Sequence, residues 1–193
     1  MALIKSISGI RGTIGGKPGE GLSPLDVVTF AAAYGTWLKK KGHPSNSIVL
    51  GRDARISGEM VSSLVANTLI GLGWNVLDIG LSTTPTVELA VPWTKAAGGI
   101  IITASHNPAQ WNALKLLNDR GEFISDQDGK DLLTIAENQD FDFADVMKLG
   151  QLTQDDSFLQ KHVDHVLGLS WVNKSVIEKA NFRVLVDAVN STG

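Results

Sequence analysis

A group of polar side chains follows a short apolar run within residues 98–116, and this arrangement restricts the fold more than any other part of the chain. Residues 99–103 are rich in β-branched side chains, which predicts a buried strand of the kind found inside parallel sheets. Ser105, His106 and Asn107 come directly after it, and the Asn-Pro pair that ends this group indicates a turn. Open α/β sheets bind their ligands at this position.

A second strand pattern returns over residues 113–117, and Lys115 stands in it between apolar neighbours. The segment therefore offers an amine besides a hydroxyl, an imidazole and an amide.

Ser105 does not lie in a Gly-x-Ser-x-Gly elbow, which argues against a serine hydrolase. The chain also lacks the Gly-x-x-x-x-Gly-Lys-Ser/Thr pattern of a nucleotide-binding P-loop.

The composition narrows the classes of partner. With 193 residues, 43% of them hydrophobic, the chain can bury one core and carry a small appendage. A net charge of -3 and a pI near 5.8 make nucleic acid and anionic membranes unsuitable partners. The chain has no cysteine, its amino terminus does not resemble a signal peptide, and no apolar stretch reaches the roughly 20 residues of a membrane span. We therefore expect a cytoplasmic α/β protein.

Strand and helix patterns alternate through the first half of the chain, as in a sheet with helices on both faces. Ser23 and Ser57 are expected to cap two of the helices. A hairpin of residues 114–118 and 122–123 is expected at one edge of the sheet. We predict a three-layer α/β/α domain over residues 1–150 with a mixed, mostly parallel sheet; its strands are expected at 3–8, 47–50, 74–79 and 99–103, and its helices at 24–41, 57–73, 84–92 and 126–138.

A different composition begins near residue 153. Residues 153–180 have a helical pattern that breaks around 168–171, and residues 182–187 have the pattern of a buried strand. His162 and His165 are one helical turn apart, but no third metal ligand accompanies them, so a solvated helix face is the preferred interpretation. We expect residues 151–193 to form a linker helix and the opening strand of a truncated second domain.

Two arginine motifs have both a structural and a functional interpretation. Arg11 lies between glycines, and such a segment is most often a surface loop, although it also lets a guanidinium reach a ligand. Residues 51–55 hold Arg52, Asp53 and Arg55. The aspartate can pair with one arginine to hold a turn, or it can fix one arginine while the other binds phosphate.

The sequence Thr-Ala-Ser-His-Asn-Pro at residues 103–108, with a lysine ten residues after its serine, resembles the phosphoserine loop of the α-D-phosphohexomutases. This family includes phosphoglucomutase, phosphomannomutase and phosphoglucosamine mutase. Residues 8–12 and 51–57 are similar to two further motifs of the family, and residues 182–193 resemble the opening of its second domain. One departure is Ala113, where the family usually has glycine.

The resemblance implies a phosphotransferase that interconverts hexose 6-phosphate and hexose 1-phosphate through a bisphosphate. Ser105 is expected to carry the phosphoryl group, and Lys115 and His106 are expected to transfer protons and stabilise charge. Arg11 is expected to steady the phosphoryl group. The resemblance also implies Mg²⁺, bound to Ser105 through its phosphate and to ligands in a second domain, and an activator of the glucose 1,6-bisphosphate type.

The expected partners are a sugar phosphate and the remaining domains of a longer chain. In the family the sugar and the substrate phosphate are bound by a third and a fourth domain, so we expect the 193 residues alone to be inactive. Glucose, mannose and glucosamine phosphates all remain possible substrates. The alternative hypothesis is a non-catalytic α/β module of the same fold with a role in assembly or regulation.

Overall fold

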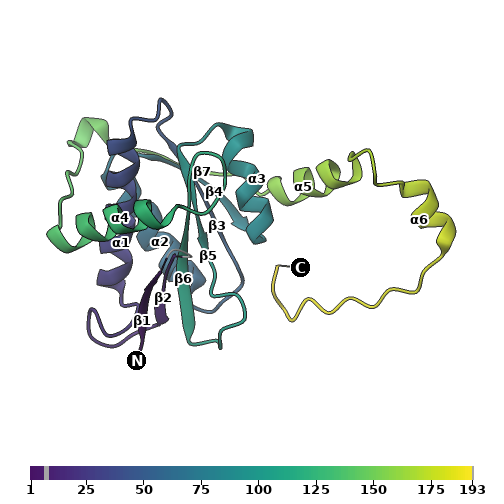
Figure 1. The fold of residues 1–193 in the computed structure, drawn as a ribbon, viewed down its shortest axis with the longest axis horizontal. Helices are drawn as coiled ribbons and strands as arrows, with labels where there is room; N and C mark the ends of the chain where they lie inside the picture. The colour runs from purple at the N-terminus through teal and green to yellow at the C-terminus, as the bar shows by residue number, and fades with distance from the viewer. Residues whose placement is uncertain (7–8, 193) are drawn as a thin grey trace.

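The computed structural model describes residues 1–6 and 9–192, and it shows one mixed sheet with helices on both faces and a helical extension at the carboxyl end (Figure 1). Within the described residues the sheet has the strand order β1-β2-β6-β5-β3-β4-β7. The strands are β1 (Leu3–Ser6), β2 (Gly9–Thr13), β3 (Ser47–Arg52), β4 (Asn75–Leu81), β5 (Gly98–Ile102), β6 (Trp111–Leu117) and β7 (Leu152–Gln154).

The strand directions confirm the mixed, mostly parallel sheet. β5, β3, β4 and β7 pair in parallel, whereas β6 is antiparallel to β5, β2 to β6, and β1 to β2. Thus β2, β3, β4, β5 and β7 run in one direction, and β1 and β6 run in the other.

The helices form the outer layers of the sandwich. They are α1 (Pro24–Lys41), α2 (Gly58–Gly71), α3 (Thr84–Thr94), α4 (Asp126–Asn138), α5 (Phe158–Leu167) and α6 (Lys174–Ala180), with a short 3₁₀ helix at Val146–Lys148. α1, α2 and α4 pack on one face of the sheet, and α3 packs on the other together with the start of α5 (Figure 1). This confirms the three-layer architecture. None of the described helices is long and apolar enough to cross a membrane.

Local capping explains where two of the helices begin. Ser23 caps α1 and exchanges hydrogen bonds with Asp26, and Gly42 ends this helix in a left-handed conformation. Ser125 and Asp128 form the same reciprocal cap on α4. Ser57 lies at the N-cap position of α2 as expected, but its side chain does not make the expected capping hydrogen bond.

The strands of the structure differ from the expected ones in three places. Residues 9–13 form β2 and not a glycine-rich loop, because they pair on both sides with β1 and β6. The expected hairpin turn is formed, because the Asn118 amide donates to the Glu122 carbonyl and an antiparallel bridge joins Leu117 to Phe123. Its expected place at an edge is wrong, because β6 is an interior strand between β2 and β5. The three-residue edge strand β7 was not expected. Residues 7–8 of the first expected strand lie outside the described residues.

The carboxyl-terminal extension is only partly as expected. α5 and α6 confirm the broken helical segment. The expected strand at 182–187 is not formed, because its backbone pairs with no strand among the described residues and its side chains are exposed. The solvated face expected for the α5 histidines is confirmed for His165, which is exposed although its ring meets Trp93 edge-on. It is only partly correct for His162, which is half-buried with its Nδ1 2.9 Å from Thr86 Oγ1.

Tyr34 joins α1 to the two central strands. Its fully buried hydroxyl shares its proton between the carbonyl oxygens of Gly99 in β5, at 3.1 Å, and Leu117 in β6, at 2.6 Å. A Cβ on Gly98 would collide with this hydroxyl, so the glycine allows the close approach. Burial raises the pKa of Tyr34 far above its usual range.

Replacing Tyr34 by phenylalanine should lower the free energy of unfolding by about 1–3 kcal/mol, because buried carbonyl groups lose a hydrogen-bond donor. Urea unfolding at neutral pH measures this loss. A variant as stable as the wild type would contradict the assigned contact.

The same pair of proteins provides a test by pH. Because the folded pKa of Tyr34 is raised, its contribution is complete below about pH 10, where unfolded tyrosine stays neutral. Above that pH the unfolded state releases the proton, and wild-type stability should fall about 1.4 kcal/mol per pH unit faster than that of the Tyr34→Phe variant.

Candidate active site

The loop between β5 and β6 lies next to the end of β3. All residues of β5 are buried, Thr103 and Ala104 after it are buried as well, and Ser105 is the first exposed residue of the loop. Arg52 ends β3 opposite Ile102, and the Asp53 amide donates to the Ile102 carbonyl over 3.0 Å. The parallel pairing therefore places the 51–55 motif beside Ser105.

Ser105 and Lys115 are in direct contact. The Lys115 ammonium donates to Ser105 Oγ over 2.9 Å, because the loop turns back and β6 returns along β5. Ser105 itself is exposed. Its φ of 52° lies in the left-handed region, which costs a non-glycine residue about 1–3 kcal/mol, so the surrounding contacts must offset this cost.

Arg55 binds the backbone of this loop. Its guanidinium donates to the carbonyl oxygens of Ser105 and Asn107, each at 2.8 Å, of Pro108 at 2.9 Å, and of Trp111 at 3.0 Å. Asp53 accepts from Arg55 Nε over 3.1 Å, so the aspartate pairs with an arginine as the structural interpretation of the motif expected.

Thr103 links the Asp53 carboxylate to Ser105. The threonine hydroxyl donates to Asp53 Oδ2 over 2.6 Å and accepts from the Ser105 amide over 3.1 Å. The Ser105 backbone is therefore fixed at both its amide and its carbonyl.

Lys115 has a partly buried environment of mixed charge. Burial lowers its pKa, whereas the negative charges of Glu88 and Asp53 act in the opposite direction. Burial also raises the pKa of Glu88, and the Lys115 charge opposes that shift. Glu88 belongs to α3, which approaches the turn after β6 so closely that only Gly121 fits against the Glu88 carbonyl.

Arg11 lies on the same face of the sheet as Lys115. Arg11 pairs with Ala113 in the β2–β6 ladder, and Ala113 and Lys115 point to the same side because they are two residues apart. Arg11 Nε is buried without a hydrogen-bond partner in the described part of the chain. His106 is exposed, and its side chain makes no hydrogen bond to any described residue.

A pocket of about 340 Å³ opens beside Ser105. Asp53 and Thr103 line it together with residues 82–85 at the start of α3 and with Ser191 and Thr192 of the extension. Residues 82–85 were not among the predicted site residues, because the Thr-Pro helix start was the only sequence signal there. The structure thus adds hydroxyl groups to the expected set.

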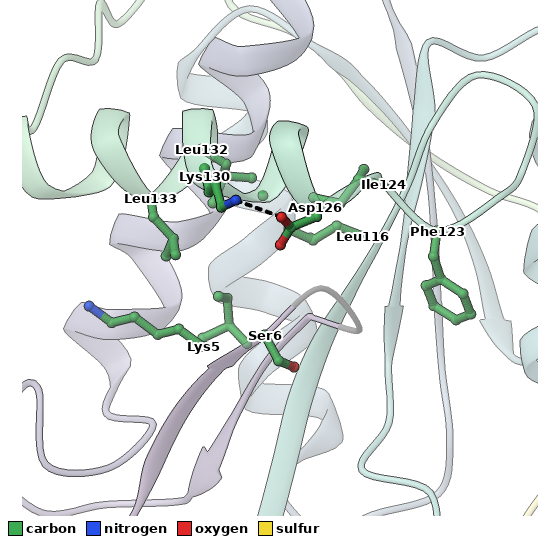
Figure 2. Close-up of a pocket in the computed structure, with 11 residues that line it drawn as sticks. Lys5, Ser6, Leu116, Phe123, Ile124, Asp126, Lys130, Leu132 and Leu133 are labelled. Carbon is green, nitrogen blue, oxygen red and sulfur yellow. Dashed lines mark ion pairs between the residues drawn. The ribbon is translucent and has the colours of Figure 1, made fainter.

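A larger pocket of about 650 Å³ lies on the opposite face of the sheet, between α4, β1 and β6 (Figure 2). Its lining is mostly apolar, including Leu116, Ile124 and Leu133, and a Lys130–Asp126 ion pair of 2.7 Å stands at its side. It contains neither Ser105 nor Lys115. The chemistry of the residues, and not pocket volume, therefore marks the candidate site.

The fold and the loop define a class of protein: a three-layer α/β/α domain that presents a serine hydroxyl, with a lysine bound to it, at the carboxyl end of a central strand. Residues 3–143 match the family model for phosphoglucomutase/phosphomannomutase, alpha/beta/alpha domain I. The chain therefore belongs to the phosphoglucomutase/phosphomannomutase family, as the sequence motifs indicated.

Individual relatives agree with this family. The chain is 32% identical over 184 residues to a phosphoglucomutase/phosphomannomutase of Thermococcus kodakarensis, covering 94% of the chain and 40% of the relative. It is 36% identical over 180 residues to a phosphomannomutase of Escherichia coli, covering 92% of the chain and 37% of that protein. The chain thus spans about 40% of the length of these relatives.

Solved structures show the same fold. A phosphoglucomutase/phosphomannomutase family protein of Burkholderia thailandensis superposes with a TM-score of 0.69 at 24% identity, covering 86% of this chain and 36% of that one. A structure described as a putative phosphomannomutase of Thermus thermophilus gives a TM-score of 0.64 at 26% identity, covering 80% of this chain and 33% of that one.

Replacing Glu88 by glutamine should lower the pKa of Lys115 further, because the substitution removes a negative charge that favours the ammonium. Titration of the lysine side-chain NMR signals measures the shift. Glu59→Gln, at an exposed position of α2, should leave the Lys115 pKa unchanged. An unchanged or higher pKa in Glu88→Gln would contradict the predicted coupling.

Proposed function

We propose that this chain is the phosphoserine domain of a phosphohexomutase, with residues 1–150 as that domain and residues 151–193 as a linker and the start of a second one. The observation that carries the proposal is the 2.9 Å contact between Lys115 Nζ and Ser105 Oγ in a loop with the family's motif. Membership of the family supports the same conclusion.

The chemistry follows from a phosphoryl group on Ser105. Phosphoserine carries about -1.5 to -2 charges at neutral pH, so cations nearby favour it. In the transfer, a sugar hydroxyl oxygen forms a bond to phosphorus while the bond between phosphorus and Ser105 Oγ breaks. The Lys115 ammonium already donates to that oxygen, and it can stabilise the charge that develops there or supply the proton.

Arg11 and His106 have supporting roles in this proposal. The unpartnered Nε of Arg11 is available to an anion on the Lys115 face, which suits a guanidinium that steadies a phosphoryl group. His106 is exposed next to Ser105 and can accept the proton of the sugar hydroxyl.

The described residues alone do not form a site for Mg²⁺, because no three potential acidic, histidine or cysteine ligands gather in that part of the chain. Asp53 is a carboxylate beside the Ser105 pocket, but Arg55 and Thr103 already occupy it. We propose that this chain contributes to a magnesium site only through the phosphate on Ser105.

The substrate and partners follow from the family. We propose a hexose phosphate as substrate, an activator of the glucose 1,6-bisphosphate type, and further domains of the same protein as partners. The relatives carry names that include phosphomannomutase and phosphoglucosamine/phosphogalactosamine mutase, so glucose, mannose and glucosamine phosphates are the sugars to compare. We expect the 193 residues to show no mutase activity alone.

Incubation of the full-length protein with glucose 1,6-bisphosphate should add one phosphoryl group to the peptide that contains Ser105, as mass spectrometry can show. Ser105→Ala should abolish this labelling and the mutase activity, because no other hydroxyl contacts Lys115 in the described residues. Ser63→Ala, at an exposed position of α2, should keep both. A wild-type protein that is never phosphorylated and is inert towards hexose phosphates would leave only a non-catalytic module.

Replacing Lys115 by methionine should lower kcat by about 10²- to 10⁴-fold, because the transferring oxygen loses its proton donor. Steady-state kinetics with the preferred hexose phosphate measures this effect. Lys130→Met removes a surface ammonium on α4 and serves as the matched control, with kcat expected near the wild-type value. Equal activity of the two variants would exclude Lys115 from the chemistry.

A further inference from the structure

We propose that Arg55 is a positioning residue whose guanidinium holds the 105–111 loop so that Ser105 Oγ faces Lys115. The inference rests on the proposed function of Ser105. In it, Arg55 binds the loop backbone and does not bind the phosphate. Arg55 acts through Ser105 and is not itself in contact with the reacting atoms.

The contacts of the Arg55 guanidinium are almost all to backbone. Four carbonyl oxygens of the loop, those of Ser105, Asn107, Pro108 and Trp111, accept from its two terminal nitrogens at 2.8 to 3.0 Å. Its Nε donates to Asp53. All three nitrogens therefore have partners, and the fork is fully engaged before any ligand binds.

The contacts of Arg55 compensate for two unfavourable features of the loop. Four carbonyl oxygens that converge on one point repel each other, and a planar cation with several donors turns this repulsion into attraction. The loop also holds Ser105 at a φ of 52°, which an isolated chain would avoid. A lysine could not replace the arginine, because its single ammonium has three donors and no rigid fork.

Asp53 fixes the arginine and extends the support to the other side of Ser105. The Asp53 carboxylate accepts from the Arg55 amide at 3.0 Å and from Arg55 Nε at 3.1 Å. It also accepts from Thr103, whose hydroxyl accepts from the Ser105 amide. The carbonyl and the amide of Ser105 are thus both connected to the same ion pair.

The position of this ion pair protects it from solvent. The Arg55 and Asp53 side chains are only 11% and 14% exposed, in contrast to the 72% and 59% of the surface pair Arg120–Glu122. A shielded pair is screened less by salt and keeps one geometry. The direction of Ser105 Oγ is therefore set by the end of β3.

The test compares Arg55→Lys with Arg120→Lys in the full-length protein. Arg55→Lys should lower kcat by about 10²-fold with KM changed less than about threefold, because the nucleophile is displaced while the substrate contacts remain. Arg120→Lys makes the same chemical change at an exposed turn and should keep both constants. A wild-type kcat for Arg55→Lys would overturn the inference.

Hydrogen exchange in the full-length protein is a second measurement, and it does not depend on activity. Arg55→Lys should speed deuterium uptake in residues 105–111 and leave uptake in β5 unchanged. If wild-type Ser105 is never phosphorylated, the proposed function fails, yet faster exchange in this loop would still support the positioning role. Unchanged exchange would overturn it.

Should Arg55→Lys fail to fold, Thr103→Val provides the same test, because it removes the hydroxyl between Ser105 and Asp53 and keeps the arginine. A lower kcat with unchanged KM and faster loop exchange is expected. Wild-type values in both measurements would overturn the inference.

Discussion

The structure depends on the burial of β5 in the middle of the sheet. A strand covered on both faces and paired on both sides has no freedom of register, since a shift by one residue would turn Ile101 from the α3 face to the opposite one. Its end is therefore a fixed point. β3 and β6 are fixed by the same pairing, so Arg55 in the loop after β3 and Lys115 within β6 can both reach Ser105.

Much of the fold was predictable because its signals are local. The apolar run of β5 and the Ser-Pro and glycine signals of α1 depend on a few adjacent residues. β2 was missed because its glycines indicate a loop, and only the two neighbouring strands make it part of the sheet. β6 was placed at an edge for a similar reason, since the strand that covers it comes from the other end of the sequence. The site residues were also predictable only where their signals are local. The hydroxyl and amine of Ser105 and Lys115 could be found from the motif, whereas the partners of Arg55 are backbone carbonyls, which have no sequence signature.

The departure at Ala113 shows how the fold accommodates a change in a family motif. Ala113 is 3% exposed and lies opposite Arg11 in the β2–β6 ladder. Its methyl group is directed to the face that Arg11 and Lys115 share, and residues 111–114 keep their regular pairing with β2. The neighbouring hydrogen bonds are also formed: the Thr103 amide donates to the Ala113 carbonyl over 3.2 Å, and the Asn112 side-chain amide donates to Ser57 Oγ over 2.9 Å. A methyl group at this position is therefore compatible with the contact of Lys115 to Ser105.

The cations around Ser105 differ in what they are free to do, and this difference supports separate roles for them. Arg55 has given its donors to the loop backbone and to Asp53, so an incoming phosphate would have to break existing bonds to recruit it. Lys115 touches the oxygen from which the phosphoryl group would leave, and its charge is balanced by Glu88 and Asp53. Arg11 keeps a buried nitrogen without a partner in the described residues. A buried N–H group without an acceptor destabilises the folded protein, and a phosphoryl group on the same face would supply the acceptor. The arrangement therefore supports the proposal that Arg55 holds the loop and that Arg11 binds the anion.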